Sequence, residues 1–236
     1  MTLDLLRVGG EQLRIGAWRG DARVAYIAPL AETRGPTAEA VRQCAAALVG
    51  RGYTEAVTAA VPPAEAAGFR AVGFTVREHL HLLAHDLLAL PTVSAPPDTR
   101  LRRAHRADRP AVLAVDGLAF PGFWRLDSEG LDEALAATPS TRFRVAVTDG
   151  RVTGYAVTGR SGHRGFIQRL AVAPTHQNRG IGALLTADGL RWLRRRNADR
   201  VMVNTQERNQ TALSLYERLG FRRQPGGLVV LHADLT

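Results

Sequence analysis

The sequence contains no lysine and a single cysteine among its 236 residues. All 31 basic residues are therefore arginines. Such a complete replacement indicates a compositional bias of the genome rather than a functional choice, although arginine makes planar, bidentate contacts to phosphate and carboxylate. The one cysteine, Cys44, excludes an intramolecular disulfide and fits a reducing compartment. It lies in an amphipathic helical pattern, which favours a buried thiol over a nucleophile.

Long apolar runs are also missing. No run approaches the roughly 20 residues that span a bilayer, and the first seven residues lack the basic start, apolar stretch and cleavage site of a secretory signal. A chain of 236 residues with a hydrophobic fraction of 45% can bury the core of one large or two small domains. The sequence therefore predicts a soluble, cytoplasmic protein without a membrane partner.

The net charge of +9 favours the binding of polyanions and of coenzyme A phosphates alike. The densest basic cluster, residues 194–196, ends a predicted helix, where cations offset the C-terminal dipole. No aromatic residues interleave it as in single-strand binders, so a nucleic-acid partner is disfavoured. Among the seven histidines, His79 and His81 share a strand face, but no carboxylate or cysteine has zinc-ligand spacing. We expect no metal.

A glycine-rich turn joins an apolar run at 166–172 to a helical pattern that begins at Ala183. This order leaves backbone N–H groups free at a helix start, where the helix dipole also favours negative charge. Gly180 and Gly182 permit a tight turn and a close approach of ligand phosphates to the backbone. The turn predicts a site for a phosphate-bearing ligand. For so short a motif, a helix start with two chance glycines is the alternative.

A second motif, about thirty residues later, contains Asn209, Ala212, Leu215, Tyr216 and the pair Gly220-Phe221. With the two motifs in this order, residues 99–236 resemble the GNAT superfamily of acyl-CoA-dependent N-acetyltransferases.

The resemblance implies an α/β (α+β) fold, in which helices flank a mixed, mostly antiparallel sheet, and acetyl-CoA as co-substrate. It implies that the coenzyme A pyrophosphate binds the backbone of Gln177, Asn178, Arg179, Gly180, Ile181 and Gly182. It also implies that the pantetheine amides pair with the strand edge of Leu170, Ala171 and Val172. Asn209 is expected to contact the same arm, and Tyr216 to protonate the departing thiolate. A packed aromatic is the alternative for Tyr216.

The pattern occurs twice in the chain. Residues 22–29 resemble residues 167–174, and Arg34-Gly35 precedes Arg179-Gly180 by 145 positions. Predicted helices at 36–50 and 183–196 and predicted strands at 55–61 and 200–206 follow in the same order. We therefore expect two pseudo-repeated lobes, a partial one at 1–90 and a catalytic one at 99–236, joined by a proline-rich linker at 91–98.

The first lobe departs from the motif at three positions. The aligned residues are Glu32 for Gln177, Thr37 for Gly182 and Phe69 for Tyr216. A carboxylate and a branched side chain oppose anion binding, and phenylalanine has no proton to give. We expect a degenerate lobe with a structural role rather than a second active site.

No general base is evident in the second lobe. Where many relatives carry a glutamate, the sequence has Gln168 and Asn204, and an amide cannot ionise. Glu207 and His163 are the nearest alternatives. Otherwise a water chain removes the proton, or the amine arrives neutral.

The segment before the sheet core holds a predicted strand at 101–105 and predicted helices at 107–120 and 128–137. The apolar positions of the first helix are Val112, Leu113, Val115, Leu118 and Ala119. Phe120, Phe123 and Trp124 follow where such folds place the acceptor loop, and they line an acceptor pocket or pack in the core.

Three functional interpretations remain: an acetyl-CoA-dependent transferase acting on a primary amine of a small molecule or a protein N-terminus, a non-catalytic acyl-CoA-binding sensor or interaction protein, and a nucleic-acid binder. The intact second motif favours the transferase. The acceptor cannot be identified from the fold, and a homodimer stays open.

Overall fold

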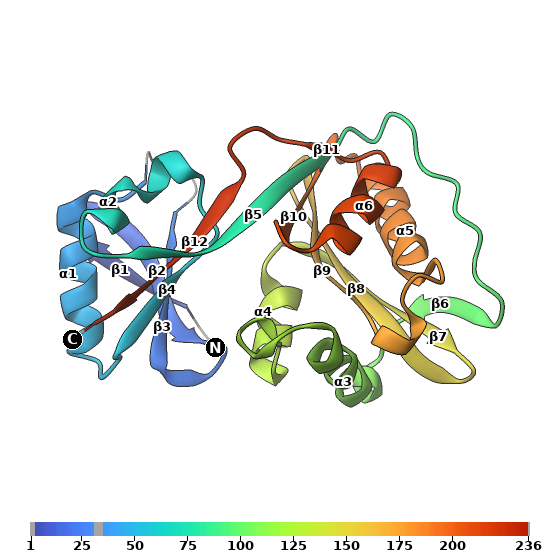
Figure 1. The fold of residues 1–236 in the computed structure, drawn as a ribbon, viewed down its shortest axis with the longest axis horizontal. Coiled ribbons are helices and arrows are strands. Elements are labelled where there is room, and N and C mark those ends of the chain that lie inside the picture. The colour runs from blue at the N-terminus through green and yellow to red at the C-terminus, as the bar shows by residue number, and fades with distance from the viewer. Residues whose placement is uncertain (1–2, 31–34, 236) are drawn as a thin grey trace. The chain divides into compact units, whose positions relative to one another are not determined.

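The computed structural model describes residues 3–30 and 35–235, and the chain divides into two compact units. Unit 1 comprises Met1–Leu82, Asn204–Asn209 and Gln224–Thr236, and unit 2 comprises Leu83–Val203 and Gln210–Arg223 (Figure 1). No helix of the described residues is long and apolar enough to cross a membrane.

Unit 1 contains a sheet with the strand order β1, β2, β3, β4, β12, β5. These strands are β1 (Asp4–Val8), β2 (Glu11–Trp18), β3 (Asp21–Pro29), β4 (Glu55–Thr58), β12 (Leu228–Asp234) and β5 (Thr75–His85), whose last residues belong to unit 2. Neighbouring strands are antiparallel except β3 and β4, which are parallel and are joined by α1 (Ala38–Val49). The 3₁₀ turn η1 (Pro63–Ala66) and the short helix α2 (Ala67–Arg70) follow β4.

Unit 2 contains strands in the order β10, β9, β8, β7, β6. Their bounds are β6 (Thr99–Arg103), β7 (Ser140–Thr148), β8 (Arg151–Ser161), β9 (Arg164–Val172) and β10 (Arg200–Gln206), whose last residues from Asn204 belong to unit 1. The short β11 (Arg222–Arg223) pairs with the end of β5. The helices are α3 (Arg109–Ala119), α4 (Ser128–Ala136), α5 (Ile181–Arg195) and α6 (Gln210–Arg218), with 3₁₀ turns η2 (Arg106–Asp108), η3 (Gly122–Trp124) and η4 (Pro174–His176). Only the β9 and β10 pair is parallel, and it is joined by α5.

Alternate residues of the unit 2 strands cover two separate cores. Val145 and Tyr155 pack with α3 and α4, whereas Ala146 and Ala156 pack with α5. This two-residue period is what a sheet covered on both faces requires. The mostly antiparallel sheet with flanking helices confirms the expected fold class.

A strand, a helix and a parallel strand recur as β3, α1, β4 and as β9, α5, β10. This recurrence agrees with the two pseudo-repeated lobes. The division by contacts, however, does not follow the expected linker at 91–98, because β12 pairs with β4 and β5 and so belongs to unit 1. That residues 99–236 form the catalytic domain stays a prediction.

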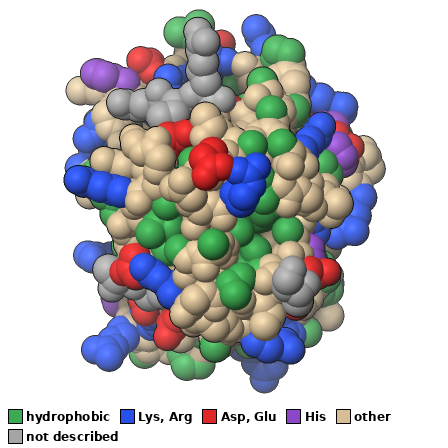
Figure 2. Space-filling view, turned by 90° about the vertical axis from the view of Figure 1, so that its left-hand side faces the viewer, with side chains coloured by type: hydrophobic (Ala, Val, Ile, Leu, Met, Phe, Trp, Pro, Cys, Tyr) green, Lys and Arg blue, Asp and Glu red, His purple; other side chains and the backbone are tan. Residues whose placement is uncertain are grey.

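Charged side chains of both signs lie on the face of unit 1 drawn in Figure 2. Arginine and acidic side chains lie there among one another, without one continuous basic patch. Most described ion pairs likewise join arginine to a nearby carboxylate, as in Arg51 with Asp4 and Arg142 with Asp188.

Candidate functional site

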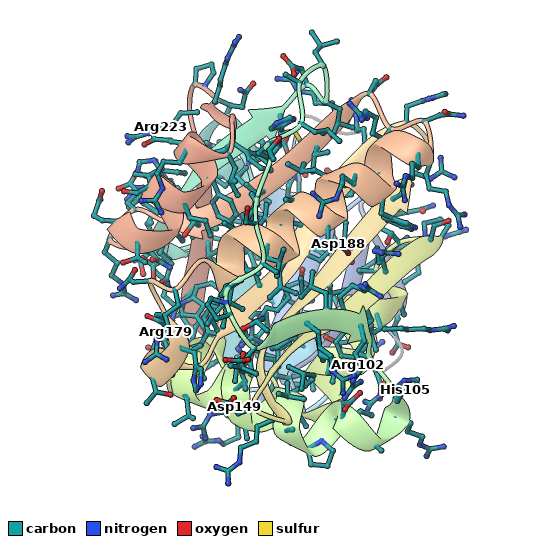
Figure 3. All side chains as sticks on the ribbon, turned by 90° about the vertical axis from the view of Figure 1, so that its right-hand side faces the viewer. Arg102, His105, Asp149, Arg179, Asp188 and Arg223 are labelled. Carbon is teal, nitrogen blue, oxygen red and sulfur yellow. The ribbon has the colours of Figure 1, made fainter. Side chains whose placement is uncertain are left out.

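The glycine turn follows β9 and η4 and leads directly into α5. Gly180 occupies the N-cap with φ 86°, and Asn178 has φ 60°, so both adopt the left-handed region that glycine and asparagine tolerate best. The first intrahelical bond runs from Leu184 N to Gly180 O at 2.9 Å. The N–H groups of residues 181–183 therefore have no intrahelical acceptor, and no described side chain caps the helix. An anion can bind at this helix start (Figure 3).

Gly182, in the first turn of α5, also has a packing role. A Cβ at Gly182 would lie 3.2 Å from Leu215 of α6 and 3.8 Å from Val172 of β9. The glycine therefore lets α6 approach the start of α5.

The edge of β9 next to the turn is open. Pairing of β9 with β10 joins residues 164–166 to residues 200–202 and does not extend further in the described part of the chain. Leu170, Ala171 and Val172 are thus hydrogen-bonded to β8 on one side only. A register shift between Val157 and Thr158 of β8 leaves Gln168 of β9 without a strand partner, which is a β-bulge.

Tyr216 lies on α6 with 5% of its surface exposed, and its ring contacts Phe221 at 5.5 Å between centroids. Its hydroxyl makes no hydrogen bond to any residue that the structure describes. Burial raises the pKa of Tyr216, against a smaller lowering by the charge of Arg169. The phenol therefore carries its proton at neutral pH, as a proton donor must.

A buried charged cluster lies in the same unit. Asp116 of α3 is 0% exposed and accepts hydrogen bonds from Arg169 of β9 and from the Tyr155 hydroxyl of β8. Burial raises the pKa of Tyr155, so this hydroxyl also keeps its proton. Sequence analysis missed all three residues. The available signal was a carboxylate at helical spacing from Val112 and Val115 on the apolar face, whereas the expected core residue Leu118 is 67% exposed.

A cavity of about 360 Å³ opens beside the glycine turn. Its walls come from the turn, the β7–β8 hairpin and the proline-rich segment, with Arg179, Ile181, Asp149, Pro96 and Asp98 among the lining residues (Figure 3). The space adjoins the uncapped start of α5.

Comparison with known proteins identifies the family. Residues 109–221 match the sequence model described as "Acetyltransferase (GNAT) family". A protein named "Mycothiol acetyltransferase" from Tsukamurella paurometabola is 31% identical over 227 residues, which cover 89% of this chain and 77% of that protein. The chain belongs to the GNAT family.

Two further comparisons concern the sequence of one relative and the fold of one solved structure. A "Mycothiol acetyltransferase" from Acidothermus cellulolyticus is 34% identical over 183 residues, and the match covers 68% of this chain and 56% of that protein, so the chain spans little more than half of its length. The solved structure of a "Tandem GNAT protein from the clavulanic acid biosynthesis pathway (without AcCoA)" superposes with a TM-score of 0.69 at 17% identity, covering 98% of this chain and 82% of that one. The likeness to this structure concerns the fold alone.

The base candidates of this GNAT chain are not brought together. His163 bonds Asn197 O from the turn before β9, at the opposite end of that strand from the glycine turn, which argues against it as the base. Gln168 lies beside the open edge with its Oε1 buried and without a partner among the described residues. Glu207 and Asn204 are exposed residues of unit 1.

Asn209 is the one expected coenzyme contact outside unit 2. It directly precedes α6, and its N–H donates to Gln206 O at 2.9 Å within unit 1. Its contact with the pantetheine arm stays a prediction.

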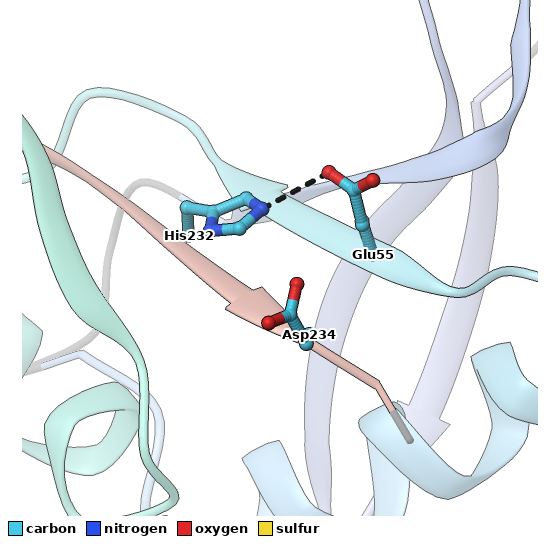
Figure 4. A group of neighbouring side chains, drawn as sticks. All are labelled: Glu55, His232 and Asp234. Carbon is cyan, nitrogen blue, oxygen red and sulfur yellow. Dashed lines mark hydrogen bonds and ion pairs between the residues drawn. The ribbon is translucent and has the colours of Figure 1, made fainter.

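One group of described residues in the GNAT chain has the spacing of metal ligands. Glu55, His232 and Asp234 lie within 4.8 Å of one another on β4 and β12 of unit 1 (Figure 4). His232 Nε2 is 3.1 Å from Glu55 Oε2, and Asp234 is exposed. The hydrogen bond between His232 and Glu55 accounts for the approach of these two side chains, and the expectation of no metal stays a prediction.

The equivalent helix start in unit 1 is already occupied. Thr37 caps α1 by accepting from Ala40 N, and the Glu11 carboxylate accepts from Thr37 N and, at 2.6 Å, from Thr37 Oγ1. A Cβ at Gly35 would lie 2.4 Å from Glu65 O, so η1 closes over this turn. Glu32 lies outside the described residues. These contacts occupy the start of α1, and the degenerate lobe itself stays a prediction.

Proposed function

We propose that the chain is an acetyl-CoA-dependent N-acetyltransferase that moves the acetyl group to a primary amine by direct attack on the thioester. The observation that carries the proposal is the uncapped start of α5 beside the open edge of β9. Free N–H groups and the helix dipole attract the pyrophosphate, and an unpaired strand edge can pair with the pantetheine amides.

In the proposed reaction, the backbone of residues 177–182 holds the pyrophosphate and residues 170–172 align the pantetheine. The neutral amine attacks the thioester carbon, the carbon–sulfur bond breaks, and the Tyr216 hydroxyl gives its proton to the departing thiolate. The amine loses its own proton to water, because Gln168 and Asn204 cannot ionise. Tyr216 is reprotonated from solvent. No step uses a metal.

The acceptor is proposed only as a class: a primary amine of a small molecule or of a protein N-terminus. The names of the relatives make mycothiol without its acetyl group one candidate to test. We also propose a cytoplasmic location, since a single unpaired cysteine fits a reducing compartment.

The test is release of free thiol from acetyl-CoA by the purified chain, with glucosamine, peptides bearing a free α-amino group and desacetylated mycothiol as amines. Amine-dependent thiol release with an acetylated product supports the transferase. Tight binding of acetyl-CoA without turnover on any amine would instead support the sensor.

A further inference from the structure

A buried ion pair ties one loop of unit 2 to the strand at the proposed reaction site. The loop comprises residues 120–126, after α3, and the ion pair joins Asp116 to Arg169 of β9. We call this pair the clamp. The inference below rests on the proposed function.

Both partners of the clamp are held rigidly. Arg169 Nε and Nη2 donate to the two carboxylate oxygens of Asp116, each at 2.8 Å, in the bidentate arrangement that fixes a guanidinium plane. The side chains of Arg169 and Asp116 are 11% and 0% exposed. Tyr155 donates a further bond to Asp116 Oδ2 at 2.5 Å.

The clamp holds the loop at three points. Arg169 Nη2 donates to Trp124 O at 2.6 Å, and the guanidinium carbon lies 3.5 Å from the centroid of the Phe120 ring. Asp116 Oδ1 accepts from Leu126 N at 2.6 Å. Two backbone groups and one ring of the loop are thus fixed by one ion pair.

The position of Arg169 on β9 connects this loop to the chemistry. Arg169 lies on the open edge of β9, directly after the bulge residue Gln168 and directly before Leu170, the first residue expected to pair with the pantetheine arm. Leu170, the next residue of β9, packs against the hydrophobic cluster that contains Tyr216, the proposed acid. The loop therefore borders the point where thioester and amine must meet.

Stability alone does not explain a buried ion pair, because well-packed apolar residues often replace one at no cost. A bidentate pair gives something apolar contacts do not, namely one fixed orientation of the groups bonded to it. We propose that Arg169, held by Asp116, is a positioning residue that sets the affinity for the amine acceptor by fixing residues 120–126 against β9.

Arg169→Lys tests the clamp, because lysine keeps the positive charge but loses the bidentate plane. The matched control is Asp188→Asn, which breaks a similar bidentate pair with Arg142, at 2.8 and 3.0 Å, on the α5 side of the same sheet. For the panel amine with the fastest thiol release, we expect Arg169→Lys to raise the amine KM about 10-fold. The Kd for acetyl-CoA, measured by calorimetry, should change less than twofold. Asp188→Asn should change neither constant.

Amide hydrogen exchange gives a second readout that needs no turnover. Exchange of the Leu126 amide and its loop neighbours should be faster in Arg169→Lys and unchanged in Asp188→Asn. If Arg169→Lys does not fold, Phe120→Leu takes its place, because it removes the ring that contacts the guanidinium. We then expect a smaller rise in the amine KM and a smaller increase in the exchange rate of the loop amides.

The outcomes separate this inference from the proposed function. If the wild-type protein turns over no amine, the proposed transferase function is wrong. Hydrogen exchange of the loop amides then tests by itself whether the clamp fixes residues 120–126. Wild-type turnover with an unchanged amine KM in Arg169→Lys overturns the positioning role. Equal losses of affinity for amine and acetyl-CoA overturn it as well, since they indicate a general structural effect.

Discussion

Phe69 of unit 1 and Tyr216 of unit 2 have corresponding positions in the repeat, and their side chains differ by one hydroxyl group. Phe69 of unit 1 contacts Phe74 at 5.3 Å between ring centroids, and Tyr216 of unit 2 contacts Phe221 at 5.5 Å. Both rings are buried in the core of their own unit. Ring packing therefore explains an aromatic residue at either position, and the role of the Tyr216 hydroxyl as the proton donor stays a prediction.

We expect Tyr216→Phe to lower kcat about 10-fold or more, because the ring stays and only the proton donor is lost. Acetyl-CoA affinity and the melting temperature should change little, since no described residue bonds to the hydroxyl. Phe69→Tyr, the reciprocal change in unit 1, is the control and should leave kcat unchanged. An unchanged kcat in Tyr216→Phe, measured where chemistry limits the rate, would reduce Tyr216 to a packing residue.

We expect Cys44 to be inert towards a disulfide reagent in the folded protein. Cys44 is 0% exposed in α1, and burial raises the pKa of its thiol to about 11, so the reactive thiolate is absent near neutral pH. The measurement is thiol titration before and after addition of denaturant, with one thiol appearing only after unfolding. Rapid reaction in the native protein would contradict the burial of Cys44.

At the scale of elements, the starts of α1 and α5 differ although the same strand–helix–strand unit contains both helices. The start of α1 is bonded to the Glu11 carboxylate through Thr37, whereas the start of α5 carries glycine and no described side-chain cap. The Glu11 carboxylate already accepts the hydrogen bond that the Thr37 N–H would give to a phosphate.

Gly182→Glu should abolish acetyl-CoA binding, because it adds bulk and negative charge at the start of α5, beside Leu215. Calorimetric titration measures this loss. Ser161→Glu adds the same charge at the exposed end of β8, where Ser161 pairs with Arg164 at the start of β9, far along the strand from the glycine turn, and this variant should bind normally. Full affinity in Gly182→Glu would place the ligand elsewhere.

Glu11→Ala should lower the free energy of unfolding by about 1 kcal/mol, the usual effect of a lost helix cap. The reason is that Thr37 loses the carboxylate that accepts from both its N–H and its hydroxyl. Urea unfolding measures the change, and Glu129→Gln, in the first turn of α4, is the control. Acetyl-CoA turnover should stay at the wild-type level.

At the scale of the molecule, both units contain the strand–helix–strand repeat but differ in what surrounds it. Unit 2 places α3 and α4 before its central strands, whereas the described residues before β3 in unit 1 form only the strands β1 and β2. Unit 1 therefore has no counterpart of the segment that carries the clamp and the expected acceptor loop.

We expect one acetyl-CoA site per chain, because of the two repeated helices α1 and α5 only α5 begins without a side-chain cap among the described residues. Calorimetry should give a stoichiometry of one for the wild type and no binding for Gly182→Glu. Two equivalent sites per chain would contradict the degenerate lobe.

The sequence by itself determined the features that depend on neighbours along the chain. The glycine turn, the strand–helix order and the Tyr216 motif are local, since backbone dihedrals and helical or strand periodicity fix them within a few residues. The family and the repeat could therefore be predicted before any coordinates.

Only the tertiary structure decided the long-range pairings. Asp116 and Arg169 are 53 positions apart, Glu11 and Thr37 are 26 apart, and β12 pairs with β4 and β5 of the opposite end of the chain. A charged residue in an apolar pattern does not reveal its partner, because burial and register select the partner only once the sheet has formed.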